Sequence, residues 1–306
     1  MRRLAMGPPP KGSLYKGRSH ILDYVKYGYV TADTGGGSAS VTMEYAYNDF
    51  AIAQLAKVLG KKDDVALFSK RAKNYQKLWD PKTQFFRAKK KDGSWLDSTS
   101  NPKWDEKWSE DYVEGTAWQY LWFVPYDVPG LQTLFGGREA ILKKLDDFWQ
   151  KTLADWKKPN PFNRRAYYWH SNEPDIHAAT LYLELGRPAD AYKWFRWIME
   201  TQYKDAPDGL AGNDDGGTLS AWYVFAAMGL YPLPATTRYY LTSPIFTRVQ
   251  LKLPQGTIEI QAPDTTSKAM FVQKVSLNGK EVKGHWIQHQ DLVKDKAVLR
   301  FEMSLK

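Results

Sequence analysis

The sequence predicts a mainly helical chain that ends in a segment of antiparallel β-structure. Between residues 38 and 222, apolar side chains recur at helical spacing. After Pro232 the pattern changes to short runs in which apolar and polar residues alternate. The 306 residues, 43% of them hydrophobic, suffice for a sizeable core. We therefore predict a helical region over residues 1–233 and an antiparallel β-sandwich segment over residues 234–306.

The first two predicted helices form an antiparallel pair. One covers SVTMEYAYNDFAIAQLAKVLG and ends at Gly60, a residue type typical of the position after a helix. The next has Asp63 as its N-cap and runs to Trp79, where Asp80 and Pro81 end it. Further helices are predicted at residues 114–123, 128–134, 138–150, 174–185, 188–203 and 218–228. The connections at residues 92–112 and 157–174 are long for a helical domain, which is typical of functional or mobile loops.

Five alternating runs predict the strands of the last seventy residues. They are RYYLTSP, TRVQLKL, TIEIQA, FVQKVSLNGKEV and AVLRFEMSL. Within the fourth run, Asn278-Gly279 predicts a two-residue hairpin turn.

Composition limits the classes of partner. The net charge is +9, but the basic residues are scattered or form short runs such as Lys89–Lys91, so we predict no nucleic-acid binding. The 13 Trp and 19 Tyr exceed what a core alone needs and favour a groove in which rings stack on sugars or bases. No cysteine is present, which excludes disulfides and thiolate metal sites. No apolar run reaches the ~18 residues of a membrane span, and the start has no apolar stretch of signal-peptide length.

Glu114 stands out among the acidic residues. It lies in YVEGTAWQYLWFVP, where burial among aromatic and aliphatic neighbours would disfavour its charged form. A carboxyl group that keeps its proton near neutral pH can serve as a general acid. The alternative is a first-turn glutamate that complements the helix dipole.

The segment HSNEPDIH offers a second polar group. Pro174 suits the first turn of a helix, with Asn172 or Glu173 at or just before the N-cap. Amide and carboxylate oxygens are also the hard ligands that calcium prefers. Capping and calcium binding both stay open, and we assign neither His170 nor His177 to a metal.

The segment GNDDGG places Asp214 and Asp215 between glycines, just before the helix predicted to start near Thr218. A capping turn explains one of these carboxylates. The second needs a cation, a shared proton or a water molecule, because adjacent like charges repel. Carboxylates on two separate loops fit glycoside hydrolysis, in which one acid donates a proton and the other activates water or attacks directly.

These segments together resemble glycoside hydrolase family 92, a family of calcium-dependent, exo-acting α-mannosidases. The resemblance is carried by VEGTAWQYLWFVPYDVPGL, HSNEPDIH, GNDDGGTLSAWYVFAAMGLYP and GYVTADTGGGSASVTMEYAYNDFAIAQLAKVLGKKDD. It implies an inverting mechanism with Glu114 as the general acid and either Asp214 or Asp215 as the general base. It also implies a calcium site with Glu173, Asn172 and Asp215 as ligands, and substrate contacts from Asn172, Glu173, Trp118 and Asn213.

The resemblance further implies that the helices form part of an (α/α)6 toroid of helical hairpins and that an N-terminal β-sandwich domain is missing. Mannose-containing glycans, either N-glycans or mannans, are the implied partners, and a secreted or cell-envelope location is expected. Two positions depart from the family pattern: Gly216 replaces a common cysteine and Ser171 a common glycine. The alternative function is an inactive or mannose-binding fragment that lacks part of the pocket.

Overall fold

The computed structural model describes residues 2–14, 17–159 and 164–305. The chain divides into two compact units, residues 1–169 and residues 170–306. The predicted loop at residues 157–174 includes residues 160–163, which lie outside the described part. In the described part, every helix is too short or too polar to span a bilayer.

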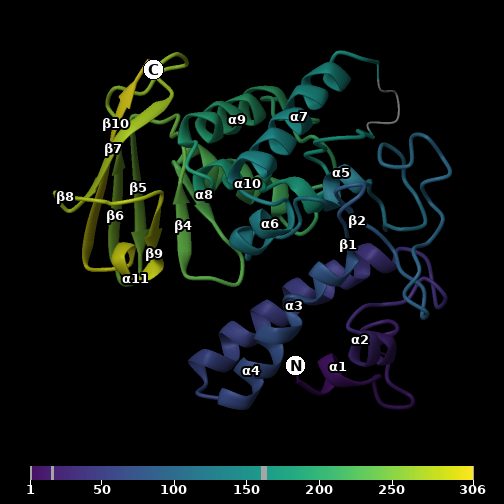
Figure 1. Ribbon diagram of the computed structural model, residues 1–306. Helices are drawn as coiled ribbons and strands as arrows, with labels where there is room; N and C mark the ends of the chain where they lie inside the picture. Colours follow the sequence, from purple (N-terminus) through teal and green to yellow (C-terminus); the bar gives the residue numbers. More distant parts are fainter. Residues whose placement is uncertain (1, 15–16, 160–163, 306) are drawn as a thin grey trace. The chain divides into compact units, whose positions relative to one another are not determined.

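The first unit consists mainly of helices. They are α1 (Arg2–Met6), α2 (Ile21–Tyr27), α3 (Ser38–Val58), α4 (Lys62–Arg71), α5 (Ala117–Tyr120), α6 (Val128–Leu134) and α7 (Arg138–Trp156), with the short strands β1 (Trp79–Asp80) and β2 (Phe85–Phe86). The predicted pair α3 and α4 is confirmed, because the two helices pack side by side (Figure 1).

The second helix of that pair is shorter than predicted. It is capped at Lys61, so that Asp63 lies in its first turn, and it ends at Arg71. A 3₁₀ turn, η1 (Asn74–Leu78), and strand β1 follow it. Tyr75 in that turn is fully buried and donates a hydrogen bond to Asp127, so tertiary packing overrides the helical pattern there.

The helix predicted at residues 114–123 is also short. Its start is fixed by a capping box, in which Thr116 Oγ1 accepts from Gln119 N (3.3 Å) and Gln119 Oε1 accepts from Thr116 N (3.1 Å). Glu114 therefore precedes the helix, and its interpretation as a first-turn glutamate is wrong.

The second unit begins with helices and ends with sheets. Its helical elements are the 3₁₀ turns η2 (Glu173–Asp175) and η3 (Ala178–Thr180) and the helices α8 (Leu181–Glu184), α9 (Pro188–Thr201), α10 (Thr218–Ala227) and α11 (His289–Leu292). The helix predicted at residues 174–185 is thus broken into three pieces. The Ile176 carbonyl accepts a hydrogen bond from the Trp222 indole (2.9 Å), which ties this segment to α10.

The strands form two sheets that share one core. Their bounds are β3 (Leu230–Pro232), β4 (Arg238–Leu241), β5 (Arg248–Leu253), β6 (Gly256–Gln261), β7 (Phe271–Leu277), β8 (Lys280–Glu281), β9 (Trp286–Gln288) and β10 (Lys296–Ser304). The strand orders are β5-β6-β10-β7-β8 and β3-β4-β9 (Figure 1). Leu230 and Leu241 of the smaller sheet share a core with Ile258 and Phe301 of the larger one, as in a sandwich.

The prediction of a purely antiparallel segment is wrong in one place. Strand β10 enters between β6 and β7 and runs antiparallel to β7, which leaves it parallel to β6. The hairpin prediction is confirmed: Leu277 pairs with Lys280, and Asn278 and Gly279 have φ values of 50° and 76°.

The two units meet at residues 169/170 rather than at the predicted 233/234. Helix α9 belongs with the sandwich because its buried Arg196 donates hydrogen bonds to Ser243 Oγ (2.8 Å), Thr265 Oγ1 (2.7 Å) and the Pro244 carbonyl. The change of sequence pattern near Pro232 therefore marks a change of secondary structure inside one unit.

Candidate active site

Glu114 lies in a tightly held loop of the first unit. Its backbone is left-handed (φ 46°), which is uncommon for a residue with a side chain. The flanking Val113 is fixed on both sides: its amide donates to Ser40 Oγ (2.9 Å), and its carbonyl accepts from the Tyr120 hydroxyl (3.0 Å). Such a conformation costs about 1–3 kcal/mol and persists where the surroundings determine it, which is typical of functional sites.

The Glu114 side chain is exposed, as is Val113. The sequence predicted that Glu114 would be buried among apolar neighbours, and the exposed side chain contradicts this prediction. Residues 117–122 of the apolar run form core instead.

Trp118 is part of that core. It is 3% exposed, and its indole nitrogen donates to Asp105 Oδ2 (3.1 Å). The ring packs against Phe85 and Phe148, and the Lys144 ammonium lies 4.3 Å from its centroid. Because neighbours occupy the ring, this position argues against the predicted contact between Trp118 and a sugar.

The Asp214 side chain caps the first turn of helix α10 in the second unit from outside the N-cap position, which Gly217 occupies. Its carboxylate accepts two hydrogen bonds from Ser220, one from the amide (2.8 Å) and one from the hydroxyl (3.0 Å). Its carbonyl accepts from the amides of Gly217 (3.2 Å) and Thr218 (2.7 Å). Asp214 is half-buried, and both of its carboxylate oxygens are engaged at the helix N-terminus.

Asp215 differs from its neighbour in exposure and in hydrogen bonding. It has a left-handed backbone (φ 45°), followed by Gly216 and Gly217 with φ values of 70° and 95°. The side chain is exposed, and no hydrogen bond or ion pair of its carboxylate is found among the described residues. The turn therefore directs one carboxylate into the helix cap and the other into solvent.

The segments HSNEPDIH and GNDDGG come together in space. A Cβ placed on Gly212 would lie 2.3 Å from the Ser171 Cβ, so only glycine fits there. This close approach brings Asn172 and Glu173 next to the turn that carries Asn213, Asp214 and Asp215. Glu173, Asn213 and Asp215 are all exposed.

A partly buried chain of hydrogen bonds links the HSNEPDIH segment to the start of α10. The Tyr203 hydroxyl donates to the Leu219 carbonyl (2.8 Å), so His170 Nε2, 2.5 Å from that hydroxyl, must be the donor to it. Burial lowers the pKa of His170 to about 3, which keeps its ring neutral. His170 is thus a structural residue that ties its own segment to Tyr203, just after α9, and Tyr203 in turn bonds to Leu219 of α10.

Sequence reasoning missed Ser220 and Tyr203. The contact between Asp214 and Ser220 spans six residues, whereas a capping box spans three, so no local motif announces it. Tyr203 approaches Leu219 only through the packing of α9 against α10.

The side-chain oxygens near the contact between Ser171 and Gly212 are of the kind that binds calcium. Asn172 precedes η2, and its side chain makes no capping hydrogen bond. Amide and carboxylate oxygens of Asn172, Glu173 and Asp215 are the hard ligands that this ion takes, six to eight at a time. Among the described residues, no group of three His, Cys, Asp or Glu side chains could hold a metal alone. A calcium ion here would therefore also need backbone, water or sugar oxygens.

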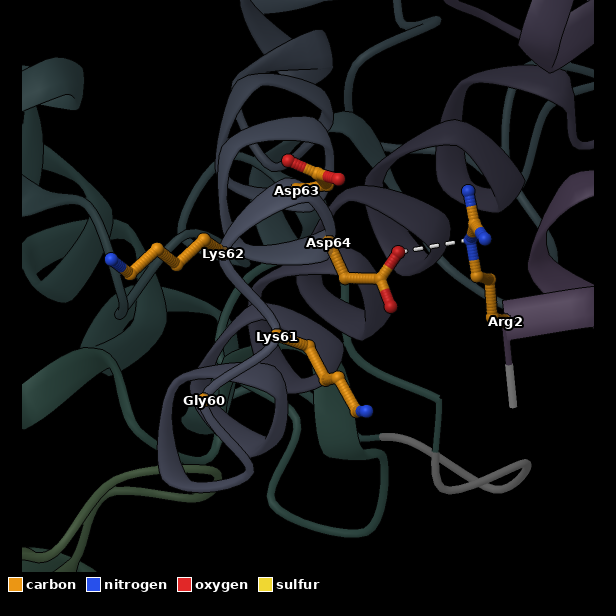
Figure 2. A pocket seen from close by; sticks show the side chains of 6 residues that line it. All are labelled: Arg2, Gly60, Lys61, Lys62, Asp63 and Asp64. Atoms are coloured by element: carbon orange, nitrogen blue, oxygen red, sulfur yellow. Dashed lines mark ion pairs between the residues drawn. The ribbon is translucent and has the colours of Figure 1, made fainter.

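A hollow of about 410 Å³ lies beside the start of α4 and is lined by charged residues of both signs (Figure 2). Asp64 points toward Arg2 and forms an ion pair with it (2.9 Å), whereas Lys62 points away from them (Figure 2). None of the predicted site residues lines this hollow.

Comparison with known proteins gives consistent matches over nearly the whole chain. Residues 1–305 match the model of the glycosyl hydrolase family 92 catalytic domain. A family GH92 α-mannosidase from Bacteroides thetaiotaomicron is 37% identical with a TM-score of 0.84, over 96% of this chain and 38% of that protein. A family GH92 inverting mannosidase from the same species is 30% identical with a TM-score of 0.85, over 99% of this chain and 42% of that protein.

Among curated proteins, an uncharacterized secreted glycosidase from Arthroderma benhamiae is 29% identical in an alignment 320 residues long, which covers 92% of this chain and 38% of that protein. The chain therefore spans only about two fifths of the length of these relatives.

Proposed function

This chain belongs to glycosyl hydrolase family 92, and from that premise we propose that it hydrolyses terminal α-linked mannose from N-glycans or mannans. The similarity to two mannosidases, at 37% and 30% identity, supports mannose as the sugar. The similarity to a glycosidase described as secreted supports an exported protein.

Glu114 is the proposed general acid, which protonates the oxygen of the scissile bond. Its exposed side chain and rigid left-handed backbone support this role, since a proton donor must be held within reach of its substrate. Because the base then activates water on the opposite face of the sugar, α-mannosides would give β-mannose as the first product.

Asp215 is the proposed general base. The observation that carries this assignment is the division of labour in the turn, where Ser220 engages both oxygens of Asp214 and the Asp215 carboxylate stays exposed. A carboxylate that accepts two hydrogen bonds is a poorer base than one that accepts none, because those bonds stabilise its charged form.

Calcium is the proposed cofactor, and Asn172 and Glu173 would hold it together with backbone, water or sugar oxygens. The Asp215 oxygen that the resemblance also implies as a ligand is left out of this proposal, because coordination would stabilise its charged form and weaken it as a base. A bound cation would supply positive charge, and hydroxyl oxygens of mannose could coordinate to it. The (α/α)6 toroid and the N-terminal β-sandwich implied by the resemblance belong to the same proposal.

The alternative is a fragment that binds mannose without cleaving it, and it is favoured by the short span relative to the relatives. Two measurements separate the alternatives: calorimetry with mannose, and release of an aryl alcohol from an activated aryl α-mannoside. Binding and calcium-dependent release support the hydrolase. Binding without release, in a folded sample that contains calcium, contradicts it.

A further inference from the structure

A second hollow, of about 380 Å³, lies on the C-terminal sandwich. It is bounded by the β7–β8 hairpin on one side and by β9 and α11 on the other. Its lining is Leu277, Asn278, Lys280, Glu281, Val282, Trp286, Ile287, Gln288, Asp291 and Lys294. None of the residues proposed for catalysis or calcium binding is among them.

Trp286 is the aromatic residue that lines this hollow. The residue is half-buried in β9, where its backbone pairs with Tyr240 of β4. The Arg238 guanidinium lies 4.4 Å from the ring centroid, and Arg238 does not line the hollow. The arginine therefore supports one part of the ring from outside, while another part faces the hollow, as in an aromatic platform.

The charges of the residues that line the hollow cancel, whereas Arg238 and Lys274 beside it add two positive charges. The lining contains two cations, Lys280 and Lys294, and two anions, Glu281 and Asp291, so their sum is zero. Ion pairs hold both anions: Glu281 lies 3.5 Å from Lys274, and Asp291 lies 3.7 Å from Lys294. The lining itself therefore favours neither an anion nor a cation, and of the two neighbouring cations Arg238 is engaged with the ring and Lys274 with Glu281.

Hydrogen-bonding groups line the hollow together with the Trp286 ring. Gln288 follows it on β9, and the charged side chains of the hairpin and α11 offer both donors and acceptors. An aromatic ring among several polar groups, in a lining whose charges sum to zero, suits a neutral ligand that has one apolar face and many hydroxyl groups. Pyranose sugars have that chemistry.

We propose that this hollow is an accessory binding site for a neutral pyranose of a glycan, with Trp286 as the stacking platform. The site is separate from the proposed catalytic residues. It would hold the glycan to the protein without taking part in its cleavage.

The test is binding of mannotriose to the full chain in an Asp215→Asn background, which prevents turnover. Titration is followed by the indole N–H signal of Trp286, assigned through its loss in Trp286→Phe. Addition of a chelator removes any contribution from the proposed calcium site. We expect saturable movement of this signal without calcium, and binding at least about tenfold weaker in Trp286→Ala.

The matched control is Phe246→Ala, which removes a 48% exposed aromatic ring of the same unit outside the hollow. It is expected to leave the affinity unchanged. An indole signal that does not move at saturating mannotriose overturns the proposal, as does equal affinity in Trp286→Ala. Stronger binding of an oligouronate than of mannotriose overturns the neutral class of ligand. The binding measurement does not require hydrolysis. Failure of the proposed hydrolase and failure of the proposed accessory site can therefore be told apart.

Discussion

Substitution of Asp214 and of Asp215 is expected to alter different properties of the protein. Asp215→Asn removes an exposed carboxylate and keeps the shape of the side chain, and asparagine tolerates the left-handed backbone at φ 45°. Its stability should therefore change by no more than about 0.5 kcal/mol. If Asp215 is the base, kcat should fall by about 10²–10⁴, or about 2.7–5.4 kcal/mol in the activation free energy.

Asp214 should show the reverse pattern. Asp214→Ala removes both hydrogen bonds to Ser220 and should lower the free energy of unfolding by about 0.5–2 kcal/mol, as for other lost N-caps. The side chain is half-exposed, which favours the lower part of that range. Asp214→Asn keeps an acceptor for the Ser220 amide and should retain most of the activity.

The assay combines two measurements on each variant. Initial rates on an aryl α-mannoside in calcium give kcat and KM, and urea unfolding followed by tryptophan fluorescence gives the free energy of unfolding. The reasoning is refuted if Asp215→Asn is fully active while Asp214→Asn, with unchanged stability, has lost its activity.

Two further predictions concern Glu114 and His170. Glu114→Gln should lose about 10²–10⁴ in kcat on a mannoside with a poor leaving group but little on a dinitrophenyl mannoside, which departs without protonation; equal losses on both would contradict the role of an acid. His170, whose pKa burial lowers to about 3, stays neutral in the folded chain while the unfolded chain takes up a proton below about 6.5. The free energy of unfolding should therefore fall as the pH drops from about 6.5 toward 3, by up to about 1.4 kcal/mol per pH unit. Urea unfolding at several pH values checks this, with the exposed His20→Gln as control, and an unchanged slope in His170→Gln would contradict it.

Local patterns predicted the elements whose ends are set by local chemistry. The Asn278-Gly279 turn and the α3–α4 pair depend on residues adjacent in the chain, and both are confirmed. The broken helix at residues 174–185 depends on a contact between Ile176 and the distant Trp222, which periodicity cannot reveal. The parallel pairing of β10 with β6 likewise follows from strand order in space.

The candidate site was predictable to the same extent. The sequence indicated that a capping turn explains one of the two aspartates, and Asp214 has that position. It could not distinguish Asp214 from Asp215, because the distinction depends on the backbone of the turn and on Ser220. Trp118 is a residue type that often stacks on sugars. Only the structure shows that its ring packs against Phe85 and Phe148 instead.

The most direct test of the proposed hydrolase is mannose release from an activated aryl α-mannoside by this 306-residue chain, with calcium and again with a chelator. We predict release in calcium, loss of release in chelator, and recovery when calcium is restored. A folded, soluble chain that releases no mannose in calcium would contradict catalysis by this chain and support the mannose-binding alternative.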